Sequence, residues 1–262
     1  MRRLVGLDFG TTNSAIAVAE EDGSVRLAKF QDGDRLVETF RSILYFFHPF
    51  DQESGGRYVA AGPAAIEAYL KSDPRGRLIQ SLKSFLASRS FTKTALYRSF
   101  YKLEDLIGLI IQELRSAAEA QFGDLEPSVV VGRPVRFSGA ATQEDDYFAS
   151  ERLRRAVQQA GFEQVYFEYE PVAAAYRYER ELDHDELVLI ADFGGGTSDF
   201  SLLPLGPSMR SRRQAQRDIL GTDGVAIAGN DFDSALIRNL VAPELGLGAE
   251  YLSHNKRLPV PP

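Results

Sequence analysis

The stretch "VGLDFGTTNS", residues 5–14, runs an apolar strand pattern into Asp-Phe-Gly and then into small hydroxyl and amide residues. Residues 190–199, "IADFGGGTSD", repeat this order, with Asp192 at the place that Asp8 holds in the first copy. Glycine lets backbone N–H groups wrap an anion, and a strand-end Asp can hold Mg²⁺ directly or through its waters. A single copy could equally be an ordinary β-turn. Two copies facing each other would clamp a phosphate chain with one metal ion between them.

Length and composition exclude several classes of protein. The 262 residues suffice for one large or two medium domains, and 44% hydrophobic with 26% charged residues is typical of a soluble globular protein. A net charge of −7 argues against nucleic-acid and anionic-membrane partners, and the absence of cysteine excludes disulfides and thiolate metal sites. The sequence has neither a signal peptide nor an apolar run of about 20 residues. We therefore expect a cytoplasmic protein with no nucleic-acid or membrane partner.

Hydrophobic patterning predicts a meander of three antiparallel strands at the N-terminus. Helical patterns follow over residues 63–71, 78–87 and 103–123. In the last of these, apolar residues recur at three- and four-residue spacing and Gly123 suits the C-terminal stop.

Strands and helices alternate from residue 127 onward. The predicted strands are 127–135, 164–169 and 186–194, the last with 198–205 as its hairpin partner, and the predicted helices are 143–160, 170–181 and 231–242. Such alternation predicts an α/β fold.

At these motifs the sequence resembles the superfamily of actin, hexokinase and heat-shock-chaperone ATPases, most of all the nucleotide-binding domain of DnaK-type heat-shock chaperones. "GLDFGTTNSAIAV" (6–18) and "IADFGGGTSDFSL" (190–202) resemble that family's two phosphate hairpins. "EYEPVAAAYRY" (168–178) resembles its connecting helix, and "IQSLKSFLAS" (79–88) resembles the segment with the catalytic lysine. "LGTDGVAIAGNDFDSALIRNLV" (220–241) resembles its Gly-Gly-x-Asp-Phe-Asp stretch.

The resemblance implies an actin-like ATPase fold of the ribonuclease-H-like type, with a mixed five-stranded sheet in its core. Residues 1–201 would form a complete first lobe, and residues 202–262 only the start of a second lobe, truncated before the second adenosine-binding glycine motif. Within the first lobe, residues 1–47 and 126–201 would form the core and residues 48–125 an inserted subdomain.

The resemblance also implies a role for each site residue. Asp8 and Asp192 would hold Mg²⁺ through coordinated water, and Lys83 would lie beside the γ-phosphate of ATP and neutralise charge in the transition state. Glu170 and Asp199 would order the attacking water and the hydration shell of the metal. The β- and γ-phosphates would be surrounded by Gly10, Thr11, Thr12 and Asn13 on one side and by Gly194, Gly195, Gly196 and Thr197 on the other, with Gly229 approaching as the second lobe closes.

Taken without the resemblance, three of these residues have plainer interpretations. Lys83 could be a surface residue of an amphipathic helix, Glu170 a first-turn acid that suits the helix dipole, and Asp199 an exposed strand residue. The sequence also departs from the family pattern. Ala228-Gly229 replaces Gly-Gly, Asn230 replaces Glu, and "GRPVRF" (132–137) replaces the usual Pro-Ala-Tyr-Phe segment, a variant associated with divergent chaperone-like proteins.

The resemblance implies the ATP-binding and hydrolysing domain of a DnaK-like molecular chaperone, in which hydrolysis of ATP to ADP and phosphate moves the lobes and controls an attached module. An actin-like filament protein, a nucleotide-binding regulator with little turnover and a small-molecule kinase of the same superfamily stay open. Because the adenosine motif is missing, we expect weak ATP affinity and slow turnover. A client protein would bind through a region outside this sequence, and the sequence does not specify co-chaperones.

Overall fold

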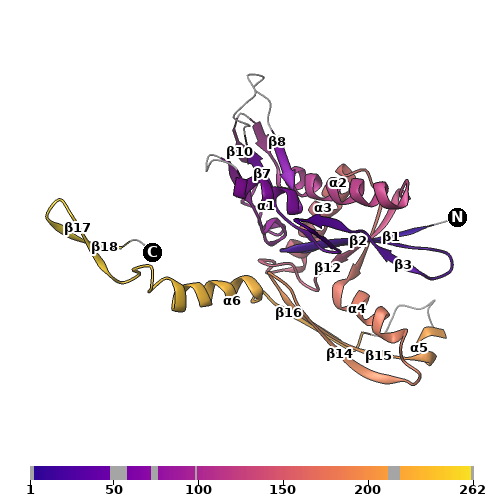
Figure 1. Cartoon of the computed structure of the whole chain (residues 1–262). Helices are drawn as coiled ribbons and strands as arrows, with labels where there is room; N and C mark the ends of the chain where they lie inside the picture. The colour runs from indigo at the N-terminus through magenta and orange to yellow at the C-terminus, as the bar shows by residue number, and fades with distance from the viewer. Residues whose placement is uncertain (1–2, 48–57, 72–75, 98, 212–218, 261–262) are drawn as a thin grey trace.

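A computed structural model describes residues 3–47, 58–71, 76–97, 99–211 and 219–260. The fold is α/β with a mixed central sheet, as the alternating pattern predicts, and Figure 1 shows two bodies of different size joined near helix α4 (Glu170–Glu179). A third part, the C-terminal arm (residues 229–260), extends away from both.

The larger body is built on a six-stranded sheet in the order β13-β12-β1-β2-β3, with β6 also paired to β2. β1 runs antiparallel to β2 and parallel to β12, and β2 runs antiparallel to β3, which confirms the predicted meander. The short strand β6 makes one strand more than the five expected. The bounds are β1 (Leu4–Phe9), β2 (Asn13–Ala19), β3 (Val25–Leu27), β6 (Phe40–Arg41), β12 (Ser128–Arg133) and β13 (Gln164–Tyr169).

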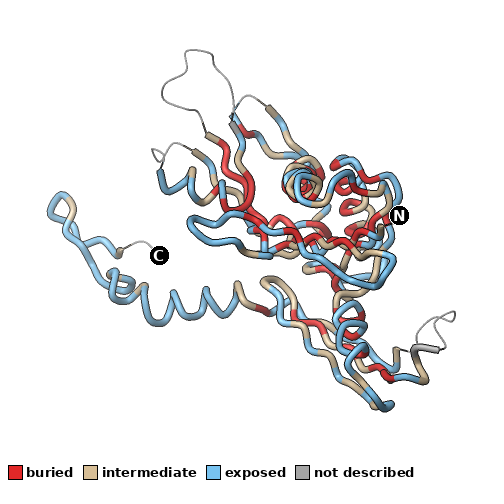
Figure 2. The backbone as a smooth tube through the Cα atoms, turned by 45° about the vertical axis from the view of Figure 1, so that its right-hand side comes forward, coloured by how far each residue is buried: buried red, intermediate tan, exposed pale blue. Residues whose placement is uncertain are grey.

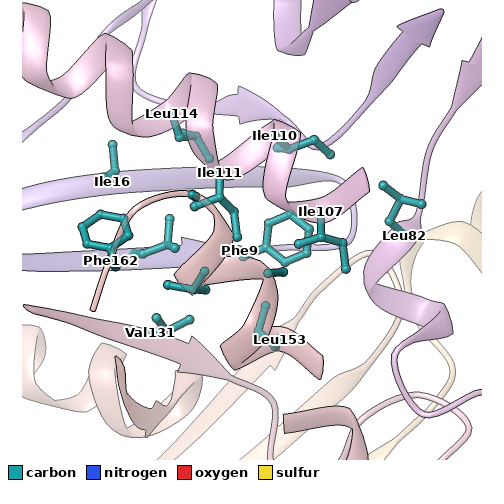
Figure 3. Close-up of a cluster of buried hydrophobic side chains, with 14 of the residues drawn as sticks. Phe9, Ile16, Leu82, Ile107, Ile110, Ile111, Leu114, Val131, Leu153 and Phe162 are labelled. Atoms are coloured by element: carbon teal, nitrogen blue, oxygen red, sulfur yellow. The ribbon is translucent and has the colours of Figure 1, made fainter. Parts of the chain in front are cut away.

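Helices α2 (Leu103–Phe122) and α3 (Gln143–Gln159) cover one face of this sheet and confirm two predicted helices. The buried core between sheet and helices includes Phe9, Ile111 and Leu153, as Figure 3 shows. Side chains alternate across a strand, so Gly6 and Asp8 of β1 face the opposite side, toward the smaller body. The core thus fixes the strand that carries Asp8.

The region between β6 and α2 holds a three-stranded sheet in the order β8-β7-β9, the helix α1 (Gly62–Lys71) and the hairpin β10-β11. The hairpin β4-β5 precedes it. The bounds are β4 (Phe30–Asp32), β5 (Arg35–Val37), β7 (Leu44–Phe47), β8 (Tyr58–Ala61), β9 (Arg77–Ile79), β10 (Thr94–Leu96) and β11 (Ser99–Tyr101).

The helix predicted over residues 78–87 is wrong. Its first residues belong to β9, which pairs with β7, and Ser81 has a left-handed backbone with a φ of 58°. Only the single 3-10 turn η1 (Leu82–Phe85) follows. The apolar spacing reflects burial of Leu82 at the start of this turn and of Leu86 directly after it, and not a continuous helix.

The smaller body has its own antiparallel sheet, in the order β14-β15-β16, of β14 (Glu186–Phe193), β15 (Ser198–Leu205) and β16 (Gly221–Val225). The pairing of β14 with β15 confirms the second predicted hairpin. The helix α4 packs on this sheet through a separate core of Val172, Ala175, Leu203 and Leu205, and α5 (Pro207–Ser211) follows β15. The expected lobe boundary between residues 201 and 202 falls inside β15, whereas the two sheets separate at α4.

The C-terminal arm consists of α6 (Gly229–Leu236), the π-type turn η2 (Ile237–Val241) and the hairpin of β17 (Glu250–Ser253) and β18 (Lys256–Pro259). α6 and η2 together confirm the predicted helix near residues 231–242. No residue of the arm is buried, as the colours of Figure 2 show. Across the described parts of the chain, no helix combines the length and apolar character that a membrane span requires.

Candidate functional site

The two repeated hairpins lie against each other at the place where the larger and the smaller body meet. A Cβ on Gly195 would lie only 2.2 Å from Thr12 Oγ1, and a Cβ on Gly196 would lie 3.0 Å from Thr11 Oγ1. Contacts this close require glycine on the second hairpin. The first hairpin is tight as well, because a Cβ on Gly10 would lie 2.1 Å from the backbone oxygen of Asn13.

A cavity of about 410 Å³ lies between the hairpins. Its lining includes every predicted site residue except Asp199. Phe193, Asn230 and Asp233 also line it and were not predicted. Asn230 and Asp233 lie three residues apart on α6, so that spacing is the sequence signal that places both on one side of the helix.

Lys83 and Glu170 form an ion pair in this cavity, with 2.6 Å between Nζ and Oε1. Lys83 comes from η1 of the larger body, and Glu170 is the first residue of α4. Gly132 of β12 gives Glu170 room, because a Cβ there would lie 3.2 Å from the Glu170 Cγ. Burial alone lowers the pKa of Lys83, but the attraction of Glu170, Asp8 and Asp192 outweighs it, so the pKa is raised and the ammonium stays charged.

Asp8 has the most perturbed carboxylate of the site. Asp8 is exposed by its accessible surface, because it opens to the cavities on either side of it, but the protein atoms around these cavities still remove much of its hydration. This loss of hydration raises the pKa of Asp8 from 3.8 to about 6, against the attraction of Lys83 and with added repulsion from Glu170 and Asp192. Burial, followed by repulsion from Glu170, also raises the pKa of Asp192. Three carboxylates around one ammonium leave the site with an excess of negative charge.

Asp199 lies outside the cavity lining, on β15 behind the second hairpin. It is 1% exposed, its Oδ1 accepts a hydrogen bond of 3.2 Å from the backbone N–H of Val135, and its side chain also contacts that of Thr197. Burial raises its pKa despite these hydrogen bonds, which lower it. In this position Asp199 ties the second hairpin to the loop between β12 and α3.

The start of α6 closes one end of the cavity. The backbone N–H of Gly229 donates to the Gly194 oxygen at 3.1 Å, and that of Asn230 donates to the Gly195 oxygen at 2.9 Å. The Asn230 amide nitrogen also lies 3.4 Å from Ser81 Oγ, just before η1. Asn230, where the family pattern has Glu, therefore contacts both the second hairpin and the segment that carries Lys83.

The side chains do not form a ready-made metal cage. Within the described ranges, no group of three or more Asp, Glu or His residues is arranged to hold an ion. An ion beside Asp8 and Asp192 would have to take most of its ligands from water and from a bound anion.

A second cavity of about 460 Å³ lies on the other side of the same carboxylates. It shares Asp8, Glu170 and Asp192 with the first, but apolar residues and glycines line most of it, among them alanines of β2, α4 and β14. Neither hairpin tip reaches it. The polar cavity is therefore the better candidate for an anionic ligand.

Comparison with protein families gives a match to a model described as "Hsp70 protein" over residues 87–245. This range is more than half of the chain and contains α4, the second hairpin and the whole of α6. The first hairpin and Lys83 lie outside the matched range.

Proposed function

Because this chain belongs to the Hsp70 family, we propose that it binds ATP and ADP together with Mg²⁺ and hydrolyses ATP to ADP and phosphate. Hsp70-family domains in general bind ATP and ADP and are ATPases, so this chain is an Hsp70-like nucleotide-binding chaperone domain. The observation that supports binding and hydrolysis of Mg-ATP by this chain is the polar cavity. Both hairpins line it together with Lys83 and the carboxylates of Asp8, Glu170 and Asp192.

Each side of the cavity has a distinct part in this proposal. The hairpins offer glycine backbone and hydroxyl groups to phosphate oxygens, as Thr11, Thr12 and Thr197 all line the cavity. The excess of carboxylates fits a divalent cation, which Asp8 and Asp192 would hold through its waters. When bound, Mg²⁺ supplies positive charge that offsets the negative charge of the phosphate oxygens.

Lys83 and Glu170 would act as a pair in the proposed hydrolysis. Glu170 holds the ammonium of Lys83 at the cavity wall, where it can offset charge on the transferred phosphoryl group. The Glu170 carboxylate can also accept a hydrogen bond from the attacking water. We assign Asp199 an indirect part, since it fixes Thr197 and the second hairpin from behind.

The arrangement of two bodies suggests how turnover could be transmitted. We propose that residues 3–169 form the first lobe and that α4 begins the second, with nucleotide state changing the angle between them. Control of an attached module, a client protein, co-chaperones, a cytoplasmic location and weak ATP affinity stay predictions from the sequence.

The experiment is isothermal titration with Mg-ATP and Mg-ADP, together with an assay of phosphate release in the absence of any acceptor. Lys83→Ala should abolish most turnover while the protein still binds nucleotide. Lys71→Ala is the matched control, because Lys71 is an exposed lysine that pairs with Glu67 on α1. No binding of either nucleotide, or turnover unchanged in Lys83→Ala, would overturn the proposal. Transfer to an acceptor without phosphate release would favour a kinase, and pelleting with ATP would favour a filament protein.

A further inference from the structure

Arg152 of α3 lies behind the candidate site and is 3% exposed. Its Nε donates to Glu104 Oε1 at 3.1 Å, and its Nη2 lies 3.4 Å from Glu104 Oε2. The remaining guanidinium donors meet backbone oxygens: Nη1 lies 3.4 Å from that of Phe85, 3.3 Å from that of Leu86 and 3.0 Å from that of Ser88, and Nη2 lies 3.1 Å from that of Phe91. Every N–H of this buried guanidinium therefore faces an acceptor.

These four carbonyls belong to the segment that directly follows Lys83. η1 is a single turn, and after it the chain makes only isolated turns, in which the backbone oxygens of Phe85 and Ser88 accept one N–H group each, from Ser88 and Phe91. The chain enters η1 through the left-handed Ser81 and reaches its next strand, β10, only at Thr94. Regular secondary structure therefore does not fix the course of residues 86–93.

We propose that Arg152 is a positioning residue for Lys83. Its guanidinium donates hydrogen bonds to the four carbonyls and so holds residues 82–91 against α2 and α3. This directs Lys83 toward Glu170 and the cavity. Glu104, in the first turn of α2, orients the guanidinium from the other side. The effect on ATP turnover rests on the proposed function, whereas the effect on the Lys83–Glu170 pair does not.

The planar fork of arginine suits this task and the ammonium of lysine does not. A guanidinium offers five donors in a fixed plane, but a lysine offers three at one point and cannot serve a carboxylate and four separated carbonyls together. Arg154, two residues along α3, provides a comparison. It pairs with Glu151 and contacts the backbone oxygen of Val165 on β13, away from η1.

The test variant is Arg152→Met with Glu104→Met, which removes both charges and leaves no unpaired carboxylate in the core. A double-mutant cycle of Lys83→Met and Glu170→Gln then measures the coupling between these two residues in urea unfolding. In the parent we expect the coupling to change the unfolding equilibrium constant about tenfold. In the Arg152→Met, Glu104→Met background it should fall below about twofold. Arg154→Met should leave it at the parent value.

A second measurement follows turnover. Mispositioning of a catalytic group costs about a hundredfold in rate, so kcat should fall by between about tenfold and a hundredfold while KM for Mg-ATP changes less than about twofold. Arg152→Lys should not restore kcat, and Arg154→Met should keep it. Retention of both the coupling and kcat in the double variant would overturn the inference. If the parent shows no turnover, the proposed function fails and the coupling alone decides whether Arg152 positions Lys83.

Discussion

Lys83 Nζ lies 2.6 Å from Glu170 Oε1 and joins η1 of the larger body to the first residue of α4. Their side chains are 8% and 15% exposed, so removal of either partner leaves the other largely shielded from water beside Asp8 and Asp192. We expect Lys83→Ala to lower single-turnover hydrolysis by about a hundredfold, typical for loss of one charge-stabilising group. Glu170→Ala should lower it similarly, and the double variant should be little worse than either single variant, because the two act as a unit. Additive losses would show that the two side chains work independently.

Gly195→Ala should disrupt the contact between the hairpins. Its Cβ would lie 2.2 Å from Thr12 Oγ1, and the β-branched Thr12 has few rotamers in which to avoid it. Nucleotide affinity, measured by titration, should fall at least about tenfold, since the hairpins must separate to admit the methyl group.

Two control variants test this cause. Gly195→Ala with Thr12→Ala should recover part of the affinity, because Thr12 Oγ1 is the closest atom. Gly6→Ala, which places a Cβ with no atom within 4 Å, should bind as the parent does. Full affinity in Gly195→Ala alone would mean that the hairpins do not need this close approach.

The raised pKa of Asp8, about 6, makes metal-dependent binding sensitive to pH. Mg²⁺ and its waters are attracted to the carboxylate and not to the neutral acid, so Mg-ATP affinity should decrease as the pH falls through about 6. Asp8→Asn should bind weakly at every pH and keep only the pH dependence that comes from Asp192 and from the terminal phosphate of ATP itself. Titrations between pH 5 and 8 at fixed ionic strength, repeated without Mg²⁺, measure the effect. An affinity that is flat over this range would contradict the perturbed carboxylate.

The raised pKa of Asp8 also predicts the direction in which the free energy of unfolding changes with pH. The native state keeps a proton on Asp8 up to about pH 6, whereas the unfolded chain loses it near 3.8. The native state therefore binds more protons within this interval, and Asp8 lowers the free energy of unfolding as the pH rises through it. Urea unfolding of the parent and of Asp8→Asn at pH 4, 5 and 6.5 should show the variant gaining stability relative to the parent as the pH rises.

Gly62 should be a sensitive position for the stability of the larger body. It has a φ of +64°, and a Cβ there would lie 2.3 Å from Cζ of Phe40. We expect Gly62→Ala to lower the free energy of unfolding by about 2 kcal/mol or more, from backbone strain and overpacking together. Gly23→Ala also has a positive φ but nothing within 4 Å, so it should cost only about 1 kcal/mol. Equal losses of unfolding free energy in Gly62→Ala and Gly23→Ala would show that the contact with Phe40 does not contribute to the effect.

The repeated motif predicted the core of the site because a strand followed by a glycine turn is a local signal. Asp8 and Asp192 end apolar strands, and both hairpins fold as their own sequence dictates. Helices such as α2 and α3 were predictable for the same reason, as their apolar residues repeat at helical spacing over more than four turns.

Long-range contacts decide what the sequence did not predict. The pairing of β9 with β7 and the left-handed Ser81 convert a helical pattern into a strand and a single turn. The role proposed for Arg152 could not be predicted for the same reason, since its acceptors are carbonyls of η1 and of the irregular segment that follows it. Nothing local distinguishes Arg152 from the neighbouring Arg154 and Arg155 of α3.

From Gly229 to Val260 no side chain is buried, so beyond the hydrogen bonds of Gly229 and Asn230 to the second hairpin this arm adds little to the cooperative unit that melts. A thermal or denaturant transition will report the unfolding of the larger and smaller bodies. The slope of the free energy of unfolding against urea concentration will reflect mainly the surface that these bodies expose on unfolding. Amides of α6 after Asn230 should exchange with solvent at nearly the rate of an isolated peptide, because so short a helix is marginal without packing.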